Sequence, residues 1–258
     1  MGETRSRDEI LKDARLLHAL WRQGALGGAS MPEDAHPPLP ADSEALARYF
    51  TLGMALNYQR DSYALWRACT ATFLDTETAW VFDLAIVANT PLADLARALA
   101  KHRVALQPRR HPQIWRDNST AFVEHPEGSV RAFFSAQDFD IARIRAAIVG
   151  AGKSFPYLRG PKIVNYWLFV MSQYMAWPLT NQAALSIAPD RHVIEASVRL
   201  GLTAAPGPPD LVAALWREVL NGSGFDPIDL HTPLWLWGRS GFPPLSQLTA
   251  KPSAAKVS

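Results

Sequence analysis

Apolar residues recur at helical spacing along almost the whole chain. In RDEILKDARLLHALWRQ (7–23), leucine and alanine return every three or four residues, which is the period of one face of an α-helix. The same period predicts further helices over residues 43–59, 61–74, 90–103, 111–125, 138–153, 162–175, 179–186, 190–202, 208–221 and 227–239. No segment alternates convincingly with the period of two that indicates a strand. The pattern therefore predicts an all-α protein.

Glycine and proline mark where these helices are interrupted. GALGGASMPEDAHPPLPADS (24–43) is a connector that detaches the first helix somewhat, so we expect two helical lobes. Thr90 and Pro91 are typical of a helix start, as N-cap and first helical residue. We expect residues 1–240 to form one all-helical domain of two lobes, and residues 241–258 to be a flexible tail.

Composition narrows the class of protein. Apolar residues make up 48% and charged residues 19% of the 258 residues, as in an ordinary core-forming protein. The single cysteine, Cys69, excludes a disulfide framework and a four-cysteine zinc site, and the histidines show no metal-ligand spacing. No segment predicts a secretory signal or a membrane span. We therefore expect a cytoplasmic protein with no membrane partner and no metal.

The charge of the chain is compatible with a nucleic-acid partner but does not by itself indicate one. The net charge is only +2, but basic residues cluster at 101–103, at 109–110 and along the segment from Arg143 to Lys162. Clustering says more about binding than the net charge does, although a solvated basic face is an equally common explanation. VGAGKS (149–154) is similar to the end of a phosphate-binding P-loop, but a helix precedes it and Pro156 follows it, so the required context is absent.

Lys162 is an unusual residue in SFPYLRGPKIVNYWLFVM (154–171). It occupies the first turn of a predicted helix, after Gly160 and Pro161, where the positive end of the helix dipole disfavours a cation. Partial burial against the aromatic helix would disfavour the ammonium further. Both effects favour the free amine, which is a nucleophile. The alternative is a surface lysine whose stem packs on apolar neighbours.

Asp190 is the second candidate. It follows Pro189 and directly precedes an amphipathic helix in SIAPDRHVIEASVRLGL. Taken alone, Asp190 is best explained as an N-cap, because aspartate is a preferred capping residue.

The two residues together resemble a known family. Helix 138–153, the turn SFPYLRGP and helix 162–175 form a helix–hairpin–helix layout, and IAPDRHVI follows it. RGPKIVNYWLFV and IAPDRHVI are similar to the Gly-x-Lys hairpin and the Pro-x-Asp segment of the helix–hairpin–helix DNA glycosylase superfamily. The resemblance implies Lys162 as the Schiff-base nucleophile and Asp190 as the catalytic aspartate.

The chain is most similar to the compact, all-helical 8-oxoguanine glycosylase/lyases known from archaea. The all-helical pattern, the long stretch from Lys162 to Asp190 and the C-terminal DLHTPLWLWGR carry this resemblance, which is strongest over residues 138–202. One departure is Leu158, which stands where the usual hairpin has its first glycine. The resemblance implies a helix–hairpin–helix glycosylase fold with the active site between its lobes, and a monomer acting on damaged double-stranded DNA without a cofactor.

Other residues follow from this layout. Lys153, Arg159 and the start of the helix at Gly160 are candidates for binding the DNA backbone. For a pocket that receives the flipped base, the candidates are Gln59, Tyr166, Trp235 and Trp237. Each of these aromatic residues has the alternative of being an ordinary core residue.

Two further functions fit the same residues. One is a non-catalytic module in which the hairpin binds a nucleic-acid backbone, Lys162 contacts a phosphate and Asp190 only caps its helix. The other is an N-glycosidase of the same fold that acts on a free nucleoside or nucleotide, which the modest net charge favours. The second predicts no salt-dependent binding to duplex DNA, whereas the DNA glycosylase predicts a steep salt dependence.

Overall fold

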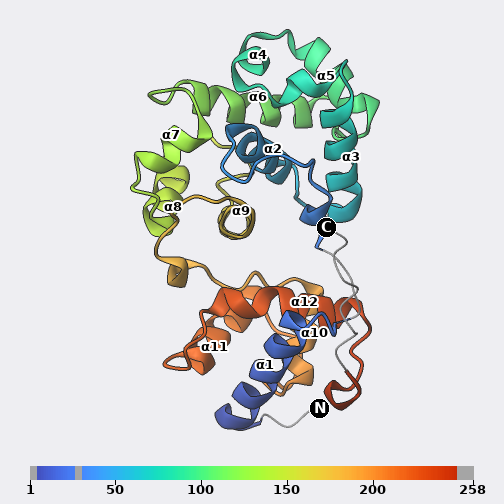
Figure 1. The fold of residues 1–258 in the computed structure, drawn as a ribbon, viewed down its shortest axis with the longest axis vertical. Helices are drawn as coiled ribbons and strands as arrows, with labels where there is room; N and C mark the ends of the chain where they lie inside the picture. The colour runs from blue at the N-terminus through green and yellow to red at the C-terminus, as the bar shows by residue number, and fades with distance from the viewer. Residues whose placement is uncertain (1–4, 27–30, 249–258) are drawn as a thin grey trace. The chain divides into compact units, whose positions relative to one another are not determined.

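A computed structural model describes residues 5–26 and 31–248 (Figure 1). Within those ranges the regular secondary structure is helical, with no β-strand and one isolated bridge between Asp140 and Thr180. The predicted all-α class is confirmed. Contacts divide the chain into two compact units, which we call unit 1 (residues 1–30 and 185–258) and unit 2 (residues 31–184).

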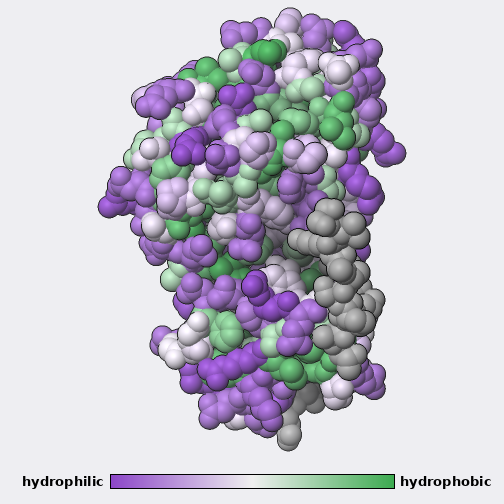
Figure 2. Space-filling model, in the orientation of Figure 1, coloured by the Kyte–Doolittle hydropathy of each residue, from purple (hydrophilic) through white to green (hydrophobic). Residues whose placement is uncertain are grey.

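No helix in the described ranges has the length and apolar character needed to cross a bilayer. Figure 2 shows hydrophilic residues spread over the visible face of each unit, with hydrophobic residues in small groups between them.

Unit 2 is a continuous segment whose core is aromatic. The indole rings of Trp66, Trp115 and Trp167 are fully buried there, and the Trp115 indole N–H donates to the backbone oxygen of Val81 at 2.7 Å. Its α-helices are α2 (Glu44–Ala55), α3 (Ser62–Leu74), α4 (Leu84–Asn89), α5 (Leu92–Lys101), α6 (Arg110–Val123), α7 (Val130–Ser135), α8 (Ile141–Gly150) and α9 (Pro161–Tyr174). Its 3₁₀ turns are η1 (Pro32–Ala35), η2 (Ala79–Phe82) and η3 (Gln182–Ala184).

Unit 1 joins an N-terminal helix to the C-terminal part of the chain. It contains α1 (Arg7–Arg22), α10 (Arg191–Arg199), α11 (Pro209–Leu220), α12 (His231–Arg239) and the 3₁₀ turns η4 (Pro227–Leu230) and η5 (Leu245–Gln247). A capping box between Ser6 and Glu9 starts α1. The Arg7 side chain then donates to the backbone oxygens of Val219 and Asn221 at 3.1 and 2.5 Å. Side chains of α1 thereby tie the first helix to the end of α11.

Three predicted helix boundaries are wrong. Helix 179–186 is reduced to η3, because the backbone N–H of Thr180 donates to Phe139 and its oxygen accepts from Ile141, which holds that residue extended. Thr90 does not cap α5, because its hydroxyl donates back to Ile86 and Pro91 takes the N-cap position.

The helix predicted from residue 138 begins only at Ile141. Asp138 and Phe139 have positive φ angles of 53° and 54°, which an α-helix does not tolerate, and Asp140 caps α8 through the Arg143 amide.

The predicted C-terminal tail is partly described. Phe242 and Pro243 pack against α12: the Phe242 ring lies 5.1 Å from the Trp237 ring, and the Trp237 indole N–H donates to the backbone oxygen of Pro243 at 2.8 Å. Residues 249–258 of that predicted tail lie outside the described residues.

Candidate functional site

The hairpin that joins α8 to α9 is anchored to α6. Phe155 is buried, and its ring lies 4.9 Å from that of Phe122. The side-chain amide of Asn118 donates to the backbone oxygen of Pro156 at 3.0 Å. Buried aromatic packing and a hydrogen bond to the turn itself fix the hairpin within unit 2.

The side chain of Leu158 packs in the core, and its backbone does not form the tight part of the turn. Its side chain is fully buried, and the left-handed backbone of the hairpin falls on Tyr157, where φ is 64°. A glycine is therefore not required at position 158, because only a positive φ favours glycine over a residue with a side chain. The departure from the glycosylase hairpin adds a core contact at this position.

Lys162 is exposed in the first turn of α9. Gly160 is the N-cap of this helix and has no side chain to cap it, and the Val164 amide donates to the Gly160 oxygen at 2.8 Å. The predicted partial burial of Lys162 is wrong: Ile163 and Val164 turn toward the core, and the lysine side chain faces away from it. The predicted position of Lys162 in the first turn of this helix is confirmed.

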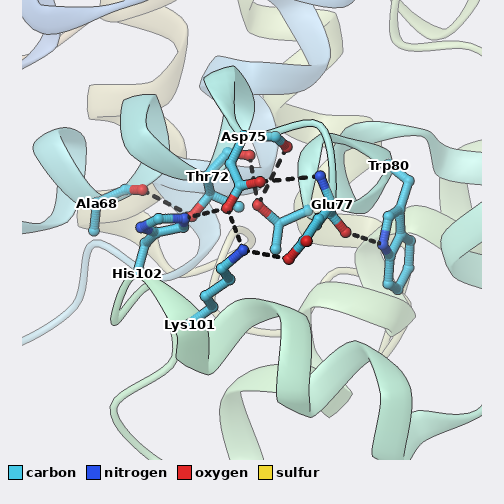
Figure 3. A network of polar contacts seen from close by, with 8 residues as sticks. Ala68, Thr72, Asp75, Glu77, Trp80, Lys101 and His102 are labelled. Atoms are coloured by element: carbon cyan, nitrogen blue, oxygen red, sulfur yellow. Dashed lines mark hydrogen bonds and ion pairs between the residues drawn. The ribbon is translucent and has the colours of Figure 1, made fainter.

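Ion pairs neutralise two residues of the basic cluster at 101–103, which are Lys101 and His102. Figure 3 shows Lys101 and His102 on the carboxylate of Asp75, at 2.7 Å each, with Lys101 also on Glu77 at 2.6 Å. The hydrogen bond from Lys101, followed by that from His102, holds the pKa of the Asp75 carboxyl far below its usual range. This network joins the end of α5 to the loop after α3, so its cations serve the fold.

In the basic segment from Arg143 to Lys162, some cations have a side-chain partner and others form no ion pair with a described residue. Arg143 pairs with Asp138, and Arg145 donates to the side chain of Asn165 at 2.8 Å. Within the described ranges Lys153, Arg159 and Lys162 form no ion pair, and all three side chains are exposed. The predicted backbone-binding residues are thus the uncompensated part of the basic segment.

Glu33 is a buried carboxyl group that the sequence did not indicate. It lies in η1, inside the connector, and is only 1% exposed. The Trp66 indole N–H donates to one carboxyl oxygen at 2.9 Å and the Tyr166 hydroxyl donates to the other at 3.2 Å. Burial raises the pKa of Glu33 to about 7, against the lowering effect of these hydrogen bonds. Glu33 thereby connects η1 and α3 to Tyr166, a predicted base-pocket residue on α9.

Asp190 is the N-cap of α10, as the capping alternative predicted. One carboxylate oxygen accepts from the Val193 amide at 3.0 Å, and the other accepts from the Trp235 indole N–H at 2.9 Å. Two donors on different helices therefore fix the orientation of this carboxylate in unit 1.

The two candidate tryptophans of α12 differ in their surroundings. Trp235 is half-buried, with Arg239 over its ring at 5.6 Å. Trp237 is buried and bonded to Pro243, which favours the core alternative for this residue.

One further predicted residue of unit 2, Gln59, lies next to a residue that contacts the hairpin. Gln59 is exposed in the α2–α3 turn, and its neighbour Tyr58 contacts Tyr157 of the hairpin with ring centroids 5.2 Å apart. Lys162 lies in the same unit, whereas Asp190 belongs to unit 1.

Substitution of Asp190 separates its capping role from any chemical role. We expect Asp190→Ala to lower the free energy of unfolding by about 1 kcal/mol, because the Val193 amide loses its acceptor. Asp190→Asn should cost much less, because asparagine caps a helix nearly as well as aspartate. Urea unfolding of both variants measures the difference; equal losses would contradict the capping role.

Among the described residues, no group of three or more His, Cys, Asp and Glu side chains is placed to hold a metal ion. Compared with protein-family models and with curated protein sequences, the chain matches none.

Proposed function

We propose that this protein is a DNA glycosylase and AP lyase that excises an oxidised purine of the 8-oxoguanine type. The observation that carries the proposal is Lys162. It is an exposed lysine with no ion pair among the described residues, and it lies at the start of α9, directly after the hairpin, where the helix has no side-chain cap. Such a placement leaves the amine accessible to a sugar, and an amine is the group that can form an imine.

The unpaired residues of the hairpin would hold the DNA backbone. Lys153 and Arg159 are exposed beside the start of α9. The amides of Lys162 and Ile163 have no acceptor four residues earlier in the helix and no side-chain cap. Amides at a helix N-terminus together with cations form a phosphate site. These contacts position the DNA and do not read its sequence.

The lysine amine and water are the two nucleophiles of the reaction. The neutral Nζ of Lys162 bonds to the sugar C1′ while the bond from C1′ to the base breaks, and the base leaves with that electron pair and takes up a proton. Opening of the sugar ring, with loss of the proton from nitrogen, gives an imine. Removal of a C2′ proton then expels the 3′ phosphate and cleaves the strand, and water releases the enzyme. Only an amine forms this imine.

Asp190 is the second proposed catalytic residue. Its carboxylate would stabilise the positive charge that develops on the sugar as the base leaves. The hydrogen bonds from Val193 and Trp235 keep that carboxylate in one orientation. In Asp190→Asn the cap survives but the charge is lost, so base release should fall while stability is retained.

Borohydride trapping tests the proposal. Wild-type protein incubated with an 8-oxoguanine duplex and reductant should give a covalent complex on a denaturing gel, because borohydride reduces the imine to a stable amine. Binding to the same duplex should weaken steeply with salt. If no complex forms while binding remains salt-dependent, the lyase proposal is wrong.

A non-catalytic nucleic-acid module is the second candidate. The hydrogen bonds to Asp190 favour it, because both carboxylate oxygens already serve the fold of unit 1. This candidate predicts duplex binding with neither base release nor trapping. Base release by wild type that is lost in Asp190→Asn would exclude it.

A further inference from the structure

Three loops of unit 2 meet at one corner and each carries strained backbone. They are residues 57–61, 103–110 and 152–160, and we call them the three-loop corner. Each contains a non-glycine residue with a positive φ: Gln59 at 50°, Arg103 at 64° and Tyr157 at 64°. Such residues persist only where their surroundings hold them, and they concentrate at functional sites.

Side chains tie the three loops together. The Arg60 guanidinium donates to the backbone oxygens of Val104 and Arg103 at 2.7 and 3.3 Å, which joins the first loop to the second. The rings of Tyr58 and Tyr157 join the first loop to the third, with centroids 5.2 Å apart and planes tilted by 54°. These contacts hold the three loops to one another, so the residues with positive φ belong to a connected structure.

The surface of this corner combines aromatic rings with free cations. Tyr58 is 50% exposed although it is a large aromatic residue, and the Arg110 guanidinium lies 4.9 Å from the centroid of the Tyr157 ring. No ion pair within the described ranges neutralises the exposed cations of these loops, which are Arg103, Arg109, Arg110, Lys153 and Arg159. The acidic residue of the first loop, Asp61, is occupied in capping α3.

From this arrangement we infer that the three-loop corner binds single-stranded nucleic acid, with an unpaired base stacked on Tyr58. Exposed aromatic rings beside uncompensated cations are how proteins hold single strands without reading their sequence. A paired base offers no free face to such a ring, so the aromatic part of the surface selects an unpaired base. This surface shares Lys153 and Arg159 with the proposed duplex site, but it goes beyond the proposed glycosylase reaction because it makes no use of Lys162 or Asp190.

Fluorescence anisotropy with the full chain tests the aromatic part. The probes are a labelled single-stranded oligothymidine and a fully paired duplex of the same length. Tyr58→Ala should weaken single-strand binding about tenfold and leave duplex binding within about twofold, and Tyr58→Phe should bind as wild type. Ile86→Ala is the matched control, since Ile86 is a comparably exposed (49%) apolar residue of unit 2, and it should change neither affinity.

Salt dependence tests the cations. Arg110→Ala should reduce the slope of log affinity against log salt for the single strand by about 0.7, the contribution of one phosphate contact. The control is Arg97→Ala, because Arg97 is already paired with Asp94 at 3.0 Å. An unchanged slope in Arg110→Ala, equal losses of Tyr58→Ala on both probes, or competition by an acidic peptide as strong as by oligothymidine would each overturn the inference.

The outcome is separable from the glycosylase proposal. A failure of borohydride trapping with a retained Tyr58 effect rejects the lyase alone, and successful trapping without a Tyr58 effect rejects the single-strand surface alone.

Discussion

A Lys162→Gln variant should form no covalent complex with an 8-oxoguanine duplex in the presence of borohydride. An amide nitrogen cannot form an imine, so the step that borohydride captures is removed. The fold should be unaffected, because the side chain is exposed and glutamine is a good helix former. Removing a cation from the start of α9 should even stabilise the helix by a few tenths of a kcal/mol. Gel analysis after reduction and urea unfolding measure the two effects.

Lys153→Gln is the matched control. Lys153 is also exposed and unpaired, and it lies in the same hairpin, before α9 begins. This variant should bind the duplex more weakly and still be trapped once the duplex is saturating. Undiminished trapping by Lys162→Gln would mean that another amine forms the imine. Equal loss in both variants at saturating duplex would mean that the loss is not specific to the amine at position 162, which would contradict its role as the nucleophile.

Glu33→Gln should remove a pH dependence from the stability of unit 2. The pKa of Glu33 rises from 4.5 to about 7 on burial, so between these values the folded protein holds a proton that the unfolded chain has lost. The free energy of unfolding therefore falls as pH rises through this window, by about 3 kcal/mol for this group. Below pH 4.5 Glu33 does not lower the free energy of unfolding, and above pH 7 it lowers it by the full amount.

The difference between wild type and variant isolates Glu33 from other titrating groups. Urea unfolding at pH 5, 6, 7 and 8 should show Glu33→Gln gaining on wild type as pH rises. The amide oxygen can still accept from Trp66, and the amide nitrogen can donate to the Tyr166 hydroxyl. A difference between Glu33→Gln and wild type that stays constant from pH 5 to pH 8 would refute the raised pKa.

Long helices with clear end signals could be predicted from the sequence. α9 follows from a long apolar run after Gly160 and Pro161, and α1 from its periodicity. By contrast, α4 and α7 have six residues each, which is too short for a helical period to be distinguished from a loop. Segment 179–186 has helical composition, but a backbone pairing of Thr180 with residues far away in the sequence overrides that preference.

The candidate site could be predicted only where its residues lie close together in the sequence. The hairpin and its cations lie within one stretch of sequence, so Lys153, Arg159 and Lys162 could be placed together. Which cations are neutralised depends on distant partners: Lys101 is taken up by Asp75 and Glu77 from the end of another helix.

The burial of Glu33 could not be predicted, because its partners are also distant in the sequence. Its partners Trp66 and Tyr166 are brought to it only by the packing of α3 and α9. In the sequence, a glutamate in a Gly/Pro-rich connector has the appearance of a solvated loop residue.

The discontinuity of unit 1 sets an order of events during synthesis. Unit 2 is one uninterrupted segment, so all its parts have been made once Ala184 has left the ribosome. The helix α1 precedes unit 2 in the chain, yet its partners in unit 1 follow unit 2, such as the end of α11 that receives Arg7. The apolar face of α1, which includes the fully buried Leu17, must therefore remain without those partners until the segment after unit 2 has been made. During that interval the nascent chain exposes an amphipathic segment, which is a kind of surface that chaperones bind.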